Sequence, residues 1–533
     1  MPVAAAEAAR PRTPERTGRA ALLVASGIFL SRIFGLVRQR FLGHYLGLGD
    51  AADAFNAAFK IPNFLQNLFG EGVLSASFIP VYARLLAEGD EREARRVAGA
   101  VAGLLAVTTS VIVLCGVLAT PWLIAVIAPG FEGAKRQLTI ELVRIFFPGA
   151  GVLVMSAWCL GVLNSHRRFF VSYTAPIFWN LAIIVTLVAL GRSRAQSPLA
   201  IAAAWGSLAG SALQLLVQLP TVLRLVGRLR PTLDVAGANV RTVIHNFAPV
   251  FVGRGVVQIS GYVDVVLATL LPAGAVAGLT TAQTLFNLPV SLFGMSVSAA
   301  ELPAMSSALG AEHEIGEFLR ARLDAGLRRI AFLVVPSAVA FLALGDVLAG
   351  AVFQTGRFTR ADSLYVWGIL GGAGVGLLAS TLGRLYSSAY YALRDTKTPL
   401  RFAIVRVTLT TALGAVFALW VPPLLHLDLK WGAAGLTASA GIAAWVEMLL
   451  LRRRLNHRIG RTGLPGLFVA KLWASAVVAA GIAWGVKALL GAAHPVLLAL
   501  AAFAPYGLVY FGLTTLLSVP ESRTVLQAVL RRR

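Results

Sequence analysis

The sequence predicts an all-α polytopic membrane protein with about fourteen transmembrane helices: two six-helix lobes related by a parallel internal repeat, plus two C-terminal helices. Three observations carry this prediction: few charges, long apolar runs and a repeated set of residues. Of 533 residues, 57% are hydrophobic and 13% are charged, whereas soluble domains carry about 25% charged residues. Apolar runs of about 20 residues, enough to cross a bilayer core, recur along the chain. A cytosolic enzyme and a disulfide-rich secreted protein are therefore excluded.

The first 19 residues are rich in Ala, Pro and Arg and predict a disordered basic arm. No small-residue cleavage site follows a short apolar core, so we do not expect a removed signal peptide. Breaks at Gly, Pro and charged clusters then delimit the spans. The predicted spans fall near 21–47, 52–83, 97–127, 138–164, 174–191, 198–225, 243–271, 275–309, 325–353, 363–391, 399–421, 431–451, 466–489 and 494–518.

Alternate loops are strongly basic, and this pattern predicts the orientation. The formal net charge is +23, but the cations sit in short loops between apolar runs, so no nucleic-acid partner is expected. Positive-inside bias places both termini in the cytoplasm, which requires an even number of spans. The basic side carries Arg92, Arg95, Arg96, Arg167, Arg168, Arg224, Arg228, Arg230, Arg328, Arg329, Arg394, Lys397, Arg452, Arg453, Arg454, Arg458, Arg461 and Arg531 to Arg533; the other side carries Lys135, Arg136, Arg192, Arg194, Arg357, Arg360 and Lys430.

An internal repeat supports two lobes in the same orientation. Pro80 and Pro176 recur 223 residues later as Pro303 and Pro399. Six spans separate the two copies, and an even number keeps their direction the same. Such two-lobe transporters carry substrate at the lobe interface and alternate access by rocking. The expected divisions are an N-lobe over 20–230, a C-lobe over 241–453, a C-terminal helix pair over 465–519 and a basic cytoplasmic tail over 520–533.

The first span carries a cationic stripe at membrane depth. Arg32, Gly35 and Arg38 fall within a wedge of about 120°, with Ser31 beside them, and the two arginines lie roughly 9 Å apart along the axis. Ionisable groups in a span usually face a cavity or a partner. Guanidinium binds phosphate bidentately and stays charged. The stripe therefore predicts a site for a large anionic head group.

The second span offers the alternative in which these arginines only hold helices together. Asp53 and Glu71 could pair with them, and Lys60 is either a phosphate contact or a snorkelling cation. Glu71 lies between two glycines that we expect to break or bend the helix. The break is expected again at Gly294-Met295, the repeat equivalent of Gly70-Glu71.

The second lobe has its own charges at membrane depth. Arg254 and Asp264 lie on the seventh span, and Arg406 on the eleventh is a candidate cation for Asp264. Cys115 and Cys159 lie inside apolar segments and form no metal-ligand cluster or disulfide framework. No hydrolase or metal-binding motif occurs, so we expect no cofactor, no metal and no catalysis.

Further motifs carry a resemblance over essentially the whole chain. With them the sequence resembles the MurJ (MviN-type) lipid II flippase family of the MOP exporter superfamily. They are Ser31-Arg32 through Gly35 and Arg38; Ala52-Asp53-Ala54-Phe55; Phe59-Lys60-Ile61-Pro62-Asn63; Phe69-Gly70-Glu71-Gly72 with Ser75; Ala128-Pro129-Gly130-Phe131; Asn164, Pro176 and Asn180; Leu213-Gln214 with Gln218-Leu219-Pro220; Gln258; Leu302-Pro303; Phe353 with Gly356; and Asp395-Thr396-Lys397-Thr398-Pro399.

The resemblance implies a role in peptidoglycan and cell-wall biogenesis and cell shape. Lipid II, an undecaprenyl-pyrophosphate-linked disaccharide-peptide, would move from the inner to the outer leaflet of the bacterial cytoplasmic membrane by alternating access. Membrane lipid and cell-wall synthesis proteins are the other partners it suggests. Arg32 and Arg38 match arginines thought to meet the pyrophosphate, and Asp53 and Glu71 match acidic positions. The last two helices match a groove for the polyprenyl tail.

Some positions depart from the family pattern. Gln66 stands where some relatives have arginine, and Gln283-Thr284 replaces a charged cluster of the eighth span. We expect Arg254 to restore the lost cavity charge. Some relatives bind sodium through an acid matching Asp264; we expect Arg406 to stand in for that sodium.

Three other functions compete with this one. A flippase for another polyprenyl-linked oligosaccharide would use similar arginines. A cation antiporter of the MATE type calls for an acidic cavity, which the first span does not offer. A non-transporting membrane scaffold would follow if the eighth-span losses abolished transport.

Overall fold

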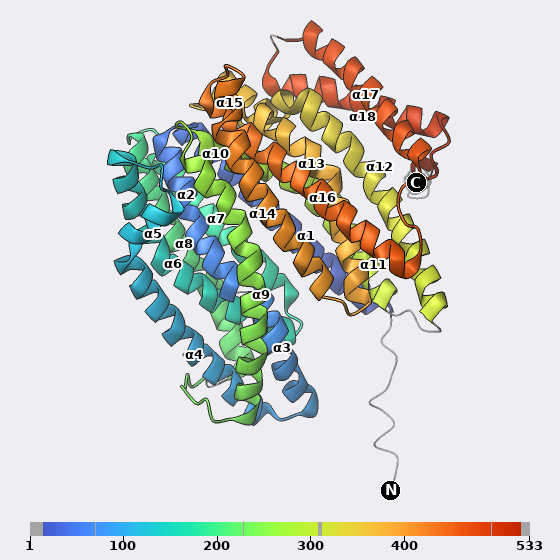
Figure 1. Cartoon of the computed structure of the whole chain (residues 1–533). Helices are drawn as coiled ribbons and strands as arrows, with labels where there is room; N and C mark the ends of the chain where they lie inside the picture. Colours follow the sequence, from blue (N-terminus) through green and yellow to red (C-terminus); the bar gives the residue numbers. More distant parts are fainter. Residues whose placement is uncertain (1–13, 70, 228, 307–311, 492, 524–533) are drawn as a thin grey trace. The chain divides into compact units, whose positions relative to one another are not determined.

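The computed structural model confirms an all-α polytopic membrane protein: every regular element in its described part is a helix (Figure 1). It describes residues 14–69, 71–227, 229–306, 312–491 and 493–523. The first helix begins at Pro14, inside the segment expected to be a disordered arm, and residues 1–13 lie outside the described part. The helices are α1 (Pro14–Leu46), α2 (Asp50–Phe69), α3 (Glu71–Glu88), α4 (Glu91–Leu118), α5 (Thr120–Ile127), α6 (Gly133–Ser165), α7 (Phe169–Leu190), α8 (Gln196–Val226), α9 (Ala238–Thr269), α10 (Ala275–Pro289), η2 (Val290–Met295), α11 (Ser296–Ser306), α12 (Glu312–Phe353), α13 (Arg360–Ala392), α14 (Lys397–Leu419), α15 (Val421–Leu424), η3 (Leu429–Trp431), α16 (Gly432–Ile459), α17 (Gly466–Leu489) and α18 (Pro495–Leu516).

Eleven helical segments within the described residues are long and apolar enough to cross a membrane. They correspond to eleven of the predicted spans. The other three predicted spans coincide with α1, with α2 and α3 together, and with α9. The multi-span prediction is confirmed, and the count of fourteen stays a prediction.

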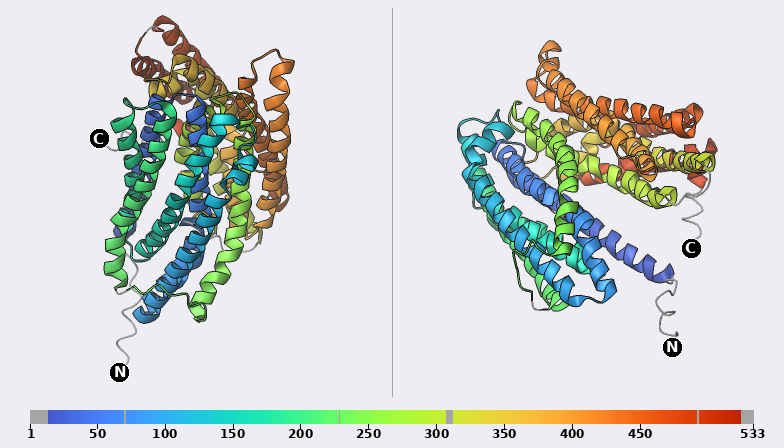
Figure 2. Two further views of the ribbon diagram at one scale, coloured as in Figure 1. Left: turned by 90° about the vertical axis from the view of Figure 1, so that its left-hand side faces the viewer. Right: turned by 60° about the horizontal axis from the view of Figure 1, so that its bottom comes forward.

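The chain divides into two compact units. The first comprises Met1–Leu42, Ala54–Ile127 and Glu132–Tyr262; the second comprises Gly43–Asp53, Ala128–Phe131 and Val263–Arg533. Within the first, α7 and α8 run side by side (Figure 2), and the Trp179 Nε1–H donates to Ser207 Oγ across them at 2.9 Å. Within the second, α12 contacts both α17 and α18 (Figure 1).

The first expected helix break is observed, and at the second position the helix continues through a π turn. In the first unit, α2 ends at Phe69 and α3 begins at Glu71. In the second, α10 gives way to a six-residue π-helix, η2, which contains Gly294. Gly294 packs closely here: a Cβ on it would lie 2.9 Å from Thr381 Cγ2.

Two tyrosines of α18 donate hydrogen bonds to backbone carbonyls of α12. One carbonyl belongs to Pro336, and the other lies four residues before it. Pro336 has no N–H, so the Phe332 carbonyl four residues earlier loses its intrahelical donor. The Tyr510 hydroxyl donates to that carbonyl at 2.6 Å, and the Tyr506 hydroxyl donates to the Pro336 carbonyl at 2.6 Å. In hydrocarbon, a freed backbone group must find such a partner.

A pair of glycines lets α13 and α16 approach closely. A Cβ on Gly376 would collide with the Gly441 backbone, and a Cβ on Gly441 would lie 2.8 Å from Gly376 N. Small residues at such crossings allow the backbone contact that drives association of helices in membranes. The same helix carries Gly371, where an added Cβ would meet nothing within 4 Å.

We predict that Gly376→Ala destabilises the protein by about 1–3 kcal/mol, the usual cost of overpacking. Thermal unfolding of the purified protein in detergent measures this as a lower Tm. Gly371→Ala on the same helix is the matched control and should keep or slightly raise Tm, because alanine favours a helix over glycine by about 1 kcal/mol. Equal Tm values for the two variants would contradict the close approach of α13 and α16.

Candidate functional site

The first unit contains a cavity of about 770 Å³. It lies among α1, α2, α3, α6, α7 and α8, close to the break between α2 and α3. The loop after α6 carries Arg167 and Arg168, so the loop charges predict that this end of the helices is cytoplasmic. The lining residues are Ser31, Arg32, Gln66, Asn67, Gly72, Ser75, Ala76, Ser156, Ala157, Leu160, Ser172, Tyr173, Pro176 and Gln214.

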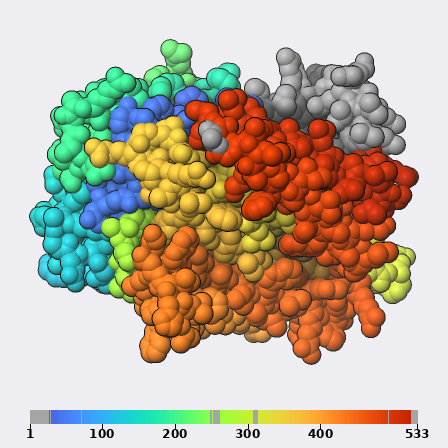
Figure 3. All heavy atoms as spheres, turned by 90° about the horizontal axis from the view of Figure 1, so that it is seen from above, coloured from blue at the N-terminus to red at the C-terminus, as the bar shows by residue number. Residues whose placement is uncertain are grey.

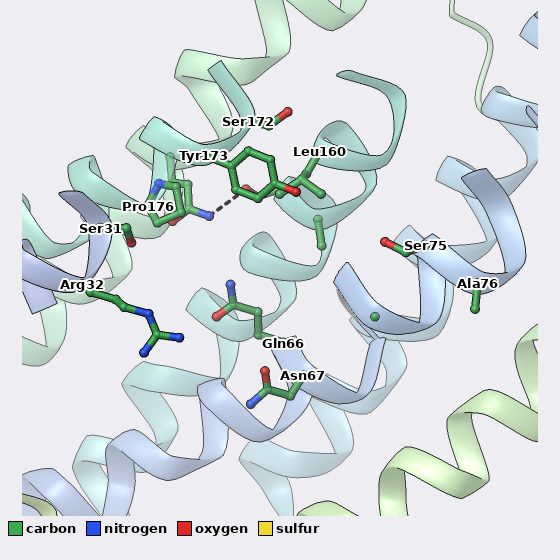
Figure 4. Close-up of a pocket in the computed structure, with 14 residues that line it drawn as sticks. Ser31, Arg32, Gln66, Asn67, Ser75, Ala76, Leu160, Ser172, Tyr173 and Pro176 are labelled. Carbon is green, nitrogen blue, oxygen red and sulfur yellow. Dashed lines mark hydrogen bonds between the residues drawn. The ribbon is translucent and has the colours of Figure 1, made fainter. Parts of the chain in front are cut away.

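Arg32 is the one charged side chain among these described lining residues. Its guanidinium faces the amides of Gln66 and Asn67 across the cavity (Figure 4). The remaining polar groups are serine and tyrosine hydroxyls and the Gln214 amide. A site with one fixed cation surrounded by neutral hydrogen-bonding groups suits an anion that also carries hydroxyls and amides.

Arg38 lies deeper along α1 and is held by protein groups. Its Nη1–H donates to Asn180 Oδ1 at 2.9 Å, and its guanidinium carbon lies 4.6 Å from the centre of the Phe59 ring. The Trp179 ring centre is 5.7 Å away. No ion pair joins Arg38 to a carboxylate within the described part of the chain. An amide and aromatic faces therefore partly replace the water that this cation loses.

A buried polar cluster forms one wall of the cavity. Gln214 and Gln218 on α8 each donate from Nε2 to Ser156 Oγ on α6, at 2.9 and 2.7 Å. All three residues are at most 3% exposed. Each glutamine leaves its Oε1 without a hydrogen-bond partner among the described residues. Gln214 and Ser156 line the cavity, so the cluster can offer hydrogen bonds to a ligand.

The structure also locates some of the other residues that were expected to contact the substrate. Ser31 lines the cavity, and a Cβ added at Gly35 would meet nothing within 4 Å. Lys60 is half-buried on α2, where its carbonyl accepts from the Tyr262 hydroxyl at 2.6 Å. The side chains of Glu71 and Arg254 lie outside the described residues. Contact of these residues with substrate stays a prediction.

Asp53 was expected among the substrate-binding residues, and the structure gives it a structural role. It belongs to the second unit and is 1% exposed. Its carboxylate accepts from the Gly274 and Ala277 N–H groups, each at 2.8 Å. These donors lie at the start of α10, where backbone N–H groups lack intrahelical acceptors. Asp53 therefore caps this helix within its unit.

The second unit contains a smaller cavity of about 150 Å³ that brings Asp264 and Arg406 together as lining residues, with Gln283. Arg406 Nη1 lies 3.0 Å from Glu447 Oε2, so its recorded carboxylate partner is one that the sequence analysis missed. Glu447 sits in an apolar stretch of α16, and its charge at membrane depth was the signal that could have found it. The Asp264–Arg406 pair and the replacement of sodium stay predictions.

Sequence reasoning also missed most of the cavity's neutral residues. Asn67, Ser156, Ser172 and Tyr173 were not singled out, and Gln214 was noted only as a motif position. Serine and tyrosine occur in many apolar helices, so their presence predicts little by itself. A glutamine pair spaced four residues apart, as in Gln214 and Gln218, was the available signal because both amides fall on one helix face.

The Asp-Thr-Lys-Thr-Pro run is a structural turn outside the spans. Asp395 accepts from Thr398 N at 3.0 Å and from Thr398 Oγ1 at 2.7 Å, at the start of α14. Its Oδ2 lies 2.9 Å from Arg458 Nη1 at the end of α16. Burial raises the pKa of Asp395, but these hydrogen bonds and the nearby Arg458 charge outweigh it and hold the pKa below its ordinary value.

These features define an all-helical, multi-span membrane protein with a cationic, polar cavity inside one of two units. Comparison with known proteins identifies the family. The sequence profile described as "Lipid II flippase MurJ" matches residues 42–532, and the chain belongs to that family. It is 31% identical over 475 residues to the lipid II flippase MurJ of Burkholderia cenocepacia, covering 87% of this chain and 89% of the relative. It is 28% identical over 496 residues to the probable lipid II flippase MurJ of Vibrio cholerae, covering 89% and 92%.

Solved structures give the same fold. A lipid II flippase MurJ in an inward closed conformation matches with a TM-score of 0.77 at 22% identity, covering 93% of this chain and 98% of that chain. A multidrug resistance MATE family transporter of the MOP superfamily, in an inward-facing conformation, matches with a TM-score of 0.65 at 18% identity, covering 82% and 98%. At these identities the likeness establishes the fold alone.

We predict that Asn180→Leu destabilises the protein by about 1–3 kcal/mol, because the Arg38 guanidinium loses its amide acceptor in a buried place. Thermal unfolding in detergent measures the loss. Asn180→Asp is the second variant: its carboxylate still accepts from Arg38 but cannot donate to the Pro176 carbonyl as Asn180 Nδ2 does at 2.9 Å, so Tm should lie between those of Asn180→Leu and the wild type. If Asn180→Leu kept the wild-type Tm, the bond to Asn180 would not be what holds Arg38.

We predict that Asp395→Asn lowers Tm near neutral pH and that the difference disappears in acid. The folded pKa of Asp395 lies below its unfolded value, so its stabilisation is fully present above the unfolded pKa of about 4. It is lost as pH falls through the folded pKa. Tm of both proteins measured across this range tests the prediction, and a difference that persists unchanged at the acidic end would refute it.

Proposed function

We propose that this chain is a lipid II flippase that moves the undecaprenyl-pyrophosphate-linked disaccharide-peptide across the bacterial cytoplasmic membrane. The observation that carries the proposal is the 770 Å³ cavity in the first unit with Arg32 as the charged residue among its described lining. Family membership supports it, because the relatives named above carry lipid II flippase as their name.

The chemistry of the cavity fits such a head group. A pyrophosphate needs fixed positive charge, and the Arg32 guanidinium can offer two parallel N–H donors to one phosphate. The sugar hydroxyls and peptide amides need neutral donors and acceptors, which Gln66, Asn67, Ser156 and Gln214 can supply. The polyprenyl tail needs no polar partner and stays in the hydrocarbon.

Arg38 has a second role in this proposal. It lies about 9 Å from Arg32 along α1, and its described side-chain acceptor is the neutral Asn180. A phosphate would be a stronger acceptor than an amide, since hydrogen bonds between charged groups are about twice as strong. Arg38 therefore attracts the anion inward and joins Arg32 on the pyrophosphate by exchanging Asn180 for it.

Transport follows without any covalent change. An anionic head group cannot enter hydrocarbon unaided because buried, unpaired charge costs many kcal/mol. Binding to arginine removes that cost, and the two lobes then alternate between inward and outward access. With both termini in the cytoplasm and a cytoplasm-negative potential, outward movement of the anion gains roughly 2.3 kcal/mol per charge per 100 mV.

The fold is shared with MATE transporters, so the cavity chemistry has to separate the two functions. Export of a cationic drug calls for acidic groups at the site. Among the described lining residues of the first-unit cavity the charged group is an arginine, and serines and amides surround it. This favours an anionic, hydroxyl-rich substrate over an organic cation.

We predict that Arg32→Gln fails to replace the native flippase in a bacterial strain depleted of its own lipid II flippase. Losing a hydrogen bond to a charged group, worth about 1.5–3 kcal/mol, corresponds to a roughly 10- to 150-fold loss of transport. Arg32→Lys keeps the charge without the bidentate geometry and should retain part of the growth. Arg40→Gln, on the same helix but away from the cavity lining, is the control. Wild-type growth with Arg32→Gln at equal expression would overturn the proposed role of Arg32.

A further inference from the structure

A second large cavity lies where α12, α13, α17 and α18 meet, within the second unit. Its volume is about 510 Å³, within the range of about 300–1,000 Å³ typical of small-molecule sites. It involves the end of α12, the start of α13 and the turn between α17 and α18. The loop charges predict that this end of the helices lies outside the cytoplasm. Figure 3, seen from above, shows the red surface of α17 and α18 beside the yellow surface of α12.

One buried ion pair forms part of the cavity wall. Lys487 Nζ lies 2.7 Å from Asp346 Oδ2 and donates to Oδ1 at 2.9 Å. The two side chains are 19% and 13% exposed. The Lys487 ammonium also lies 5.4 Å from the centre of the Trp367 ring. This pair is neutral as a unit and joins α17 to α12.

Arg360 gives the cavity its net positive charge. It is the third ionisable residue of the described lining, it is exposed, and no ion pair is recorded for it within the described residues. Asp362, two residues later, is not part of the lining; its carboxylate accepts from the Thr359 N–H and hydroxyl in a capping box. One cation is therefore left facing the cavity, with the Gln354 amide as a neutral polar neighbour.

Apolar side chains adjoin this polar pocket on the α17–α18 side. Trp484 and Leu498 line it, and Trp484 is 58% exposed. Leu489 and Leu497, on either side of the turn, are 86% and 61% exposed. Indole rings favour the membrane–water interface because they combine an apolar body with an N–H donor. A ligand held here would meet a cation at one end and lipid-facing apolar surface at the other.

We propose that this cavity binds an anionic glycerophospholipid, with the phosphate on Arg360 and the glycerol and acyl chains against Trp484 and Leu498. A free phosphate would use only the cation and would leave the apolar border unused. A neutral or zwitterionic lipid would leave the surplus charge of Arg360 uncompensated. The site is separate from the first-unit cavity and does not depend on the proposed transport function.

The experiment titrates delipidated full-length protein in detergent with phosphatidylglycerol and follows bound lipid by native mass spectrometry. Phosphatidylethanolamine and inorganic phosphate are titrated in parallel. The wild type should prefer phosphatidylglycerol, and Arg360→Gln should weaken its binding about fivefold, since one basic residue near a lipid surface contributes about 1 kcal/mol. Arg357→Gln is the matched control: it is exposed, three residues away and not part of the lining.

A second variant separates the two ends of the ligand. Trp484→Ala should weaken phosphatidylglycerol and phosphatidylethanolamine by the same factor, whereas Arg360→Gln should weaken only the anionic lipid. Equal effects of Arg360→Gln and Arg357→Gln would overturn the site. Inorganic phosphate that displaces the lipid at equal concentration, or no preference for phosphatidylglycerol over phosphatidylethanolamine, would overturn the assignment to an anionic lipid.

Discussion

The structure depends on one constraint: a charge at membrane depth must have a partner or a water-filled space. The described residues satisfy it in three ways: a carboxylate partner, a neutral partner or a polar cavity. Arg406 has the Glu447 carboxylate, and Lys487 has Asp346. Arg38 has an amide and aromatic faces. Arg32 faces a cavity lined by neutral polar groups. Cations paired with carboxylates join helices within a unit, and Arg32 lines the polar cavity in which we propose that substrate binds.

The same constraint applies to the backbone. The Phe332 carbonyl freed by Pro336 accepts from Tyr510 of α18, and the N–H groups at the start of α10 donate to Asp53. Each of these hydrogen bonds comes from a side chain far away in the sequence. Each bond therefore also fixes how the helix that carries this side chain packs. Glycine contacts such as Gly376 with Gly441 add close approach where side chains would keep helices apart. Irregular backbone at membrane depth is thus supported by specific side-chain contacts.

A transporter for a large anionic lipid needs a cavity that binds phosphate without trapping it. A buried carboxylate beside each arginine would neutralise the site, and several bare arginines would hold the anion too tightly. In the described lining of the first-unit cavity, the Arg32 guanidinium is the charged group, and amides and hydroxyls such as those of Gln214 and Ser156 provide neutral contacts. Arg38 donates to the neutral amide oxygen of Asn180. A transporter must both bind and release its substrate, and weak, exchangeable hydrogen-bond partners permit both.

The sequence by itself determined the all-helical membrane class, the irregular helix positions near Gly70 and Gly294, and the position of Arg32 and Arg38 on one helix. Those features follow from composition, periodicity and spacing along a single helix, which are local properties, and the family followed from the resemblance of motifs. Tertiary structure alone decided which partner each charge has: Glu447 for Arg406, Asn180 for Arg38, and two backbone N–H groups for Asp53. It also decided which neutral side chains form the cavity. Partners come from helices far apart in sequence, and their choice depends on the distance and burial that packing creates, which no pattern along one helix records.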